Sequence, residues 1–217
     1  MNRPAPRVAV LISGEGSNLQ ALLDAAAAGT LGAEIAVVVS NRAAARGLVR
    51  ARNAGVPARH LGGKNMTREA YDEALAALLA EYSPDLLVLA GFMRIFSPGF
   101  VARYAGRILN VHPSLLPSYP GLDTHRRVLE AGEAWHGATV HFVTAELDAG
   151  PPIIQYRLPV GHGDTVESLT ARVHVGEHLI LPRAVEWFAA GRLRLENGSV
   201  MLDGKRLPQP LIMEEIT

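Results

Sequence analysis

The sequence contains no cysteine. This absence excludes disulfide bonds, catalytic thiolates and the cysteine-ligated zinc and iron–sulfur sites. An excess of charge is also missing, because 21 Lys and Arg residues balance 21 Asp and Glu residues. The composition therefore gives no reason to expect binding to nucleic acid or to an anionic membrane surface. Any anionic ligand must be held by a local site.

Aromatic residues and long apolar runs are scarce too. Aromatic residues make up 6% of the chain and form no stripe on which nucleic acid bases could stack. The first apolar run, residues 8–12, is too short for a signal peptide or a membrane span. We therefore expect a cytoplasmic protein.

The first half alternates short apolar runs with amphipathic segments. Runs rich in Val, Ile and Leu are typical of buried strands, and the amphipathic segments between them indicate helices. Strands that are apolar throughout and joined by helices imply a parallel sheet covered on both faces. The predicted strands are residues 7–12, 34–39, 56–60 and 85–90, and the predicted helices are residues 17–28, 43–54 and 68–82.

The second half changes character. A proline-rich loop (113–121) and a turn-rich connection (148–152) separate strands that have no long helix between them. We predict a single α/β domain over residues 1–217, in which helices cover both faces of a mixed sheet, parallel in its N-terminal half and antiparallel in its C-terminal part. The predicted elements of this half are strands at 107–112, 138–144 and 153–160, a helix at 165–190 bent at Pro182, and a hairpin at 193–202.

A glycine-rich turn (residues 14–18) joins the first strand to the first helix. Glycine lets the backbone approach a ligand, the free N–H groups of a helix N-terminus can bind a phosphate, and Ser17 and Asn18 add side-chain donors. A tight turn with a serine N-cap is about equally compatible with this string. The string lacks the third glycine of a dinucleotide fingerprint, and Ser40-Asn41 replaces the acidic residue expected after the second strand. An NAD enzyme is therefore disfavoured.

Asn110 and His112 lie two residues apart at the end of a predicted strand, so their side chains point to the same face. Ligands bind at the ends of such strands, and an amide beside an imidazole can stabilise an oxyanion and transfer a proton. A single histidine here is more often structural, but the paired asparagine and the irregular loop that follows favour a function.

Asp148 lies in a turn with Gly150 and Pro151, where an aspartate commonly caps its own backbone. The alternative is a carboxylate that the fold brings beside His112, where it would orient the imidazole and favour its protonated form. Spacing alone does not decide between the two.

Two other histidines, His174 and His178, have helical spacing and could form a pair of metal ligands. The residues between them do not match the zincin pattern, and the sequence offers no evident third ligand. We therefore expect no metal site.

Several strings in this sequence resemble the folate-dependent formyltransferases, and the resemblance extends over nearly the whole chain. Asn110-Val-His112, with Leu147-Asp-Ala-Gly-Pro151 downstream, is a specific signature of the family's catalytic domain. The opening Gly16-Ser-Asn-Leu19 resembles the branch of the family that formylates glycinamide ribonucleotide. The expectation of a single domain agrees with that branch too. The other matching strings include Leu89-Ala-Gly-Phe-Met-Arg-Ile95, Tyr119-Pro-Gly121, His136-Gly-Ala-Thr-Val-His-Phe-Val143 and Glu177-His178.

The resemblance implies that the formyl group of 10-formyltetrahydrofolate is transferred to the amine of glycinamide ribonucleotide, a step of purine biosynthesis that needs no metal. Asn110 and protonated His112 would stabilise the oxyanion, while Asp148 would support the imidazolium and help proton movement through a bound water. The implied acceptor-binding residues are Gly16, Ser17, Asn18 and Glu177, of which Glu177 reaches the ribose. The implied folate-binding residues are Arg68, Met93, Arg94, Ile95, Phe96, Asn110, Thr144, Ala145, Glu146, Leu147 and Asp148.

Two other interpretations stay open. A hydrolase on the same scaffold would release formate from formylfolate, and a non-catalytic module would bind a sugar phosphate with the glycine-rich turn alone. The set of Asn110, His112 and Asp148 disfavours the module, and the phosphate turn disfavours the hydrolase. We expect small-molecule substrates, no nucleic acid or membrane partner, and a monomer or a homodimer.

Overall fold

The structure, a computed structural model, describes residues 4–215. Its N-terminal half comprises β1 (Arg7–Ile12), α1 (Ser17–Ala27), β2 (Glu34–Ser40), α2 (Arg46–Asn53), β3 (Ala58–His60), α3 (Arg68–Ala80), β4 (Leu86–Leu89), α4 (Pro98–Arg103) and β5 (Ile108–His112). Its C-terminal half comprises α5 (Thr124–Ala131), β6 (Trp135–Phe142), β7 (Pro152–Pro159), α6 (Val166–Ala189), β8 (Leu193–Glu196), β9 (Ser199–Leu202), β10 (Lys205–Arg206) and β11 (Leu211–Glu214).

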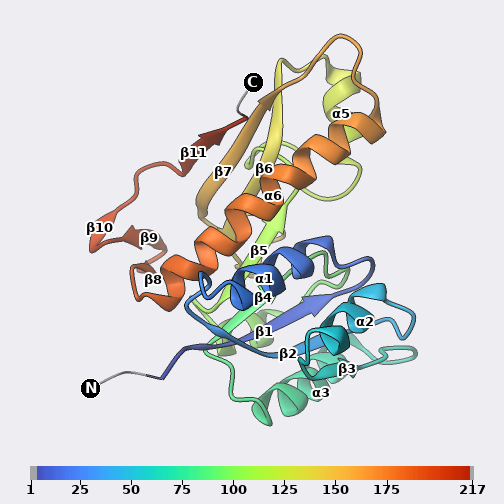
Figure 1. Cartoon of the computed structure of the whole chain (residues 1–217), viewed down its shortest axis with the longest axis vertical. Helices are drawn as coiled ribbons and strands as arrows, with labels where there is room; N and C mark the ends of the chain where they lie inside the picture. The colour runs from blue at the N-terminus through green and yellow to red at the C-terminus, as the bar shows by residue number, and fades with distance from the viewer. Residues whose placement is uncertain (1–3, 216–217) are drawn as a thin grey trace.

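One large sheet runs through the molecule in the order β11-β7-β6-β5-β4-β1-β2-β3 (Figure 1). The five strands from β3 to β5 are mutually parallel, as the alternation of strands and helices predicts. At β5 the direction changes, because β6 pairs antiparallel with β5 and β7 pairs antiparallel with β6. The predicted mixed sheet is therefore confirmed, with its change of direction beside the strand that carries Asn110 and His112.

Helices cover both faces of this sheet. Alternate residues of β1 enter different cores: Val8 and Val10 pack in the core that contains α1, α2 and α6, while Ala9 and Leu11 pack in the core that contains α3 and α4. Side chains of β1 are thus buried on both sides, which explains why this strand has no polar face.

The C-terminal part continues beyond the predicted hairpin. The strands β10 and β11 were not predicted, and β11 pairs with β7 in parallel at the edge of the large sheet, so this part is not purely antiparallel. The hairpin predicted at 193–202 is present as β8 and β9, but it belongs to a separate three-stranded sheet. Its turn has positive φ at Asn197 (48°) and Gly198 (74°), the geometry that Asn-Gly turns adopt.

Helix boundaries follow the sequence with small shifts. The predicted helix at 43–54 begins only at Arg46, and Pro182 lies inside α6 without ending it. Thr67 caps α3 by accepting a hydrogen bond from the Ala70 N–H. The short helices α4 and α5 were not predicted, because segments of six and eight residues give little periodic signal. Within residues 4–215, no helix is both long enough and apolar enough to cross a membrane.

Candidate active site

The glycine-rich turn passes directly from β1 into α1. Gly16 is the N-cap of α1 and has a left-handed backbone (φ 76°, ψ 35°), while Ser17 is the first helical residue, so the serine N-cap interpretation is wrong. Among residues 4–215 no side chain caps this helix end, which leaves the first N–H groups of α1 available to a ligand. A Cβ on Gly16 would lie 2.7 Å from the Cα of Gly47 at the start of α2, so this position requires glycine.

An arginine of α2 binds the glycine-rich turn through three hydrogen bonds. The Arg50 guanidinium donates to the Glu15 carbonyl (2.9 Å), to the Glu15 carboxylate (2.8 Å) and to the Gln20 side chain (3.1 Å). Arg46 forms a second, more exposed ion pair with Glu15 at 3.3 Å. A lone carboxylate here would repel an anionic ligand from the helix end, and these two cations offset its charge.

A buried carboxylate lies beside the same turn. The Asn18 amide donates to Glu177 of α6 at 2.7 Å, and Glu177 is 3% exposed. Burial raises the pKa of Glu177, and His174 lies 3.9 Å from its carboxylate. The side-chain oxygen of Asn18 (Oδ1) is buried and has no hydrogen-bond partner among the described residues. An unsatisfied acceptor beside a carboxylate suits the hydroxyl groups of a sugar.

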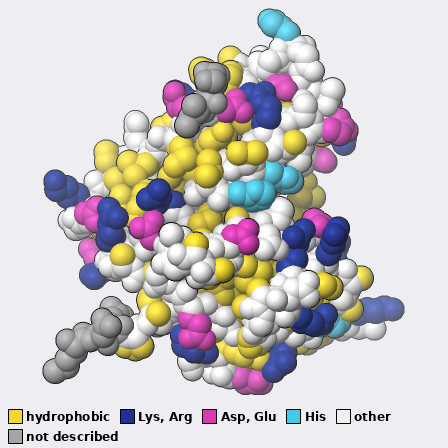
Figure 2. Space-filling model, in the orientation of Figure 1, with side chains coloured by type: hydrophobic (Ala, Val, Ile, Leu, Met, Phe, Trp, Pro, Cys, Tyr) yellow, Lys and Arg dark blue, Asp and Glu magenta, His cyan; other side chains and the backbone are white. Residues whose placement is uncertain are grey.

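The middle of α6 lies on one face of the molecule. Figure 2 shows histidine side chains gathered there, along the course of α6 in Figure 1. The rings of His174 and His178 stack with their centroids 6.1 Å apart. Among the described residues, no group of three His, Asp or Glu side chains is arranged to hold a metal ion.

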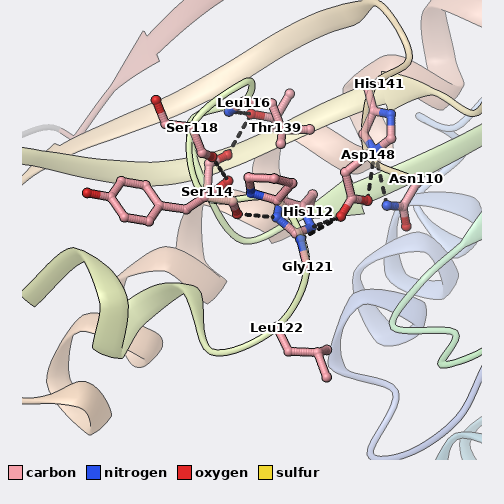
Figure 3. Close-up of polar contacts among 12 residues, drawn as sticks. Asn110, His112, Ser114, Leu116, Ser118, Gly121, Leu122, Thr139, His141 and Asp148 are labelled. Atoms are coloured by element: carbon pink, nitrogen blue, oxygen red, sulfur yellow. Dashed lines mark hydrogen bonds and ion pairs between the residues drawn. The ribbon is translucent and has the colours of Figure 1, made fainter. Parts of the chain in front are cut away.

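A second polar group, the buried cluster (Asn110, His112, His141 and Asp148), lies where β5 meets β6 (Figure 3). Asn110 pairs across the strands with His141, and His112 pairs with Thr139, so their side chains share one face of the sheet. Asp148 enters from the connection between β6 and β7. Its carboxylate lies 3.5 Å from the His112 ring and accepts a hydrogen bond from the Gly121 N–H at 2.9 Å. The fold thus brings the three predicted catalytic residues together.

Both ring nitrogens of His112 face oxygen atoms. Nε2 lies 2.9 Å from the Tyr119 carbonyl oxygen, and Nδ1 lies 3.5 Å from the Asp148 carboxylate. A neutral imidazole carries only one N–H, whereas the imidazolium carries two and satisfies both oxygens. The arrangement around this ring therefore suits a positive charge at a site where the His112 and Asp148 side chains are 7% and 8% exposed.

His141 orients Asn110, a role that the sequence did not reveal. Burial lowers the pKa of His141 to about 4, so its ring is neutral at pH 7. Because Nδ1 faces the Phe142 carbonyl at 2.9 Å and must carry the proton, Nε2 is free to accept from the Asn110 amide at 3.1 Å. One amide hydrogen of Asn110 is thereby engaged, and the other stays available to a ligand. Only the regular spacing of Thr139 and His141 along one strand could have indicated this.

Side chains of β6 and β7 hold the proline-rich loop after His112 by hydrogen bonds. Thr139 donates to the Ser114 carbonyl at 2.6 Å and accepts from the Leu116 N–H at 3.0 Å. Gln155 of β7 donates to the Leu116 carbonyl at 2.8 Å and to Thr139 at 3.0 Å. These contacts fix the loop that supplies the Tyr119 and Gly121 backbone groups to the buried cluster, and sequence reasoning missed both side chains.

Three of the predicted folate-binding residues are exposed apolar side chains. Met93 and Ile95 follow β4 and are 56% and 50% exposed, and Leu147, next to Asp148, is 53% exposed. Phe96 instead is buried and stacks between Phe92 and Phe100, so only its backbone can meet a ligand. The remaining predicted residues are Arg94, whose guanidinium lies over the Tyr71 ring at 3.8 Å, the exposed Arg68, Ala145 and Glu146, and the half-buried Thr144.

A family model described as formyl transferase matches residues 6–185. The chain belongs to the formyl transferase family. The curated phosphoribosylglycinamide formyltransferase of Escherichia coli is 53% identical over 202 residues, which cover 93% of this chain and 95% of that protein. The solved structure of the phosphoribosylglycinamide formyltransferase of Coxiella burnetii has 48% sequence identity to this chain and superposes with a TM-score of 0.92, covering 96% of this chain and 99% of that one.

Family membership covers more than one reaction. A formyltetrahydrofolate deformylase from Pseudomonas syringae pv. tomato shares the fold with a TM-score of 0.85 at 29% identity, and the match covers 91% of this chain and 66% of that one. Proteins named as formyltransferases and a protein named as a deformylase therefore share this fold. Whether this chain transfers the formyl group or hydrolyses formylfolate has to be argued from its glycine-rich turn and its buried cluster.

Proposed function

We propose that this formyl transferase moves the formyl group of 10-formyltetrahydrofolate to the amine of glycinamide ribonucleotide. The observation that carries the proposal is the pairing of two sites at the ends of β1 and β5, which β4 separates in the sheet: an uncapped helix N-terminus beside Asn18 and Glu177, and the buried cluster. The first suits a sugar phosphate, and the second suits acyl transfer. A deformylase has no use for the first site.

The acceptor binds with its phosphate at the N-terminal N–H groups of α1 and its ribose at Glu177. The side-chain oxygen of Asn18, which lacks a hydrogen-bond partner among the described residues, can accept a hydrogen bond from a ribose hydroxyl. The net charge of the chain is zero, so the phosphate is attracted locally by the helix end rather than by the whole protein.

Formylfolate binds along the 93–96 segment and the residues that precede Asp148. The exposed Met93, Ile95 and Leu147 offer apolar contact to a flat ring system, and the backbone groups between them can bind its polar edge. Arg68, exposed at the start of α3, supplies the cation for the carboxylates of the folate tail. This arrangement fits the proposed donor without a metal.

The reaction begins when the acceptor amine attacks the formyl carbon, forming a new C–N bond and an oxyanion. The free amide hydrogen of Asn110 and the positive charge of His112 stabilise that oxyanion. Asp148, 3.5 Å from the His112 ring, balances the charge of the imidazolium and assists, through a water, the transfer of a proton from the attacking amine to N10 of the folate. The bond from the formyl carbon to N10 then breaks, which releases formylated acceptor and tetrahydrofolate.

The decisive experiment measures formyl transfer and formate release from 10-formyltetrahydrofolate, each with and without glycinamide ribonucleotide. Consumption of formylfolate should depend on the acceptor, and a dephosphorylated acceptor should serve poorly, because the phosphate contributes remote binding energy that positions the amine. Rapid formate release that is indifferent to the acceptor would replace this proposal with a deformylase.

A further inference from the structure

Ser13 is a buried polar residue to which the mechanism above assigns no role. It lies at the end of β1, immediately before the glycine-rich turn, and is 3% exposed. Its hydroxyl accepts a hydrogen bond from the Met93 N–H at 2.7 Å and donates to the Asn41 side-chain oxygen at 2.6 Å. One hydroxyl therefore connects three segments, which follow β1, β2 and β4.

The direction of this chain of hydrogen bonds is fixed. The Met93 N–H can only donate, so the Ser13 oxygen accepts from it and the Ser13 proton must go to Asn41. Hydrogen bonds linked in this way polarise one another, and a buried chain of this kind holds its members rigidly. Removing the hydroxyl would leave the Met93 N–H and the Asn41 oxygen without their partner.

The segments that Ser13 connects are those that carry the two substrates. Met93 opens the 93–96 segment, assigned above to formylfolate, and Gly14, which follows Ser13, opens the turn assigned to the acceptor phosphate. We propose that Ser13, with Asn41, is a positioning residue that sets the separation of these two binding segments, and so of the amine and the formyl carbon. This inference rests on the proposed function, since it needs two ligands that react with each other.

Such a role has a kinetic signature that a merely structural serine lacks. Each ligand keeps its own contacts when the hydroxyl is removed, so the KM for each should change little. The turnover number should fall, because a small displacement of two reacting atoms takes them out of attacking geometry. A residue that only stabilises the fold would lower the melting temperature and leave kcat unchanged at a temperature where the variant is folded.

The test compares Ser13→Ala, Asn41→Leu and Asn41→Asp with the wild-type chain. We expect kcat to fall about tenfold in Ser13→Ala and in Asn41→Leu, with each KM within about threefold of wild type. Asn41→Asp keeps an oxygen acceptor for the Ser13 proton and should recover most of kcat. Because Asn41 is only half-buried, its variants keep the test decisive if Ser13→Ala does not fold.

Ser40→Ala is the matched control. Ser40 is a fully buried serine at the end of the next strand, and its hydroxyl also makes two hydrogen bonds, but both are to the Arg42 backbone (2.9 and 3.0 Å) and join no distant segments. This variant should lose melting temperature and keep kcat. A Ser13→Ala or Asn41→Leu enzyme with wild-type kcat, or with a loss confined to one KM, would overturn the inference while an active wild type keeps the proposed function. A wild-type chain that transfers no formyl group would overturn both.

Discussion

The glycine-rich turn follows β1 and the buried cluster lies on β5, two strands away in the same sheet, and the two regions are built from different kinds of contact. The turn offers backbone N–H groups, uses glycine at Gly16 to let α2 approach, and is held from behind by Arg50. The cluster consists of side chains enclosed by a loop, with His112 and Asp148 almost fully buried. A binding surface of main-chain groups tolerates the loss of one side chain, whereas a buried network of charges does not.

The comparison predicts that the largest effects follow changes in the buried cluster. Replacing His112 or Asn110 by Ala should lower kcat by about a hundredfold or more, because each removes charge or an N–H donor from the developing oxyanion. Circular dichroism should show that both variants fold. A folded His112→Ala protein with near wild-type turnover would remove His112 from the mechanism.

A smaller effect is expected for Asp148→Asn. The amide keeps the shape of the side chain and its contact with the Gly121 N–H, but it no longer favours the imidazolium form of His112. We expect kcat to fall, because the positive charge that stabilises the oxyanion then lacks its carboxylate partner. The measurement is kcat under saturating substrates, with circular dichroism to show that the variant folds. Full activity would leave Asp148 as an ordinary turn residue.

These two regions also differ in how far the sequence reveals them. The turn is local: a strand, a glycine-rich string and a helix follow one another, so its position could be predicted, although the serine N-cap could not be distinguished from Gly16. The cluster depends on the antiparallel pairing of β5 with β6, which places His141 opposite Asn110. The pairing of these strands is set by tertiary structure and cannot be deduced from local sequence. From the residues alone, Asp148 could therefore be either a turn cap or a partner of His112, and no role could be assigned to His141.

The edge of the fold was missed for a similar reason. The β11 strand has exposed Leu211 and Ile212, and it is defined by its pairing with β7 rather than by a periodic pattern of its own. The parallel core strands were predicted closely, because residues such as Val10 and Val38 are buried on a sheet that is covered on both faces.

Changes in the turn should act on the acceptor rather than on the chemistry. The double variant Ser17→Ala and Asn18→Ala keeps the backbone N–H groups, so the loss in acceptor binding should be partial, about 1–3 kcal/mol for the missing polar contacts. The KM for glycinamide ribonucleotide should rise while the KM for formylfolate stays nearly constant. Equal increases in both values would show that the turn does not belong to one substrate.

Acid should weaken the region around the buried cluster. Burial lowers the pKa of His125, His136 and His141 to about 4 each, below the ordinary value of about 6.5. As pH falls from about 6.5 to 4, the unfolded chain binds protons that the native chain does not, so the free energy of unfolding decreases in this window. Melting temperatures across it should fall, and His136→Asn should reduce the slope. The exposed His162→Asn is the control, and an equal change of slope in that variant would contradict this account.

The smallest expected effect is that of metal removal, for which we predict no change in either region. The chain has no cysteine, and in the buried cluster the histidine nitrogens already face protein groups: His112 faces Tyr119 and Asp148, and His141 faces Phe142 and Asn110. A metal would have to displace these contacts, which hold one ring in a form that suits a positive charge and the other as an acceptor from Asn110. Exhaustive dialysis against a chelator, followed by the transfer assay and a melting curve, should leave both kcat and melting temperature unchanged. Activity that is lost on chelation and restored by zinc would show that a histidine pair such as His174 and His178 finds a third ligand when substrate binds, and the proposed metal-free mechanism would then be wrong.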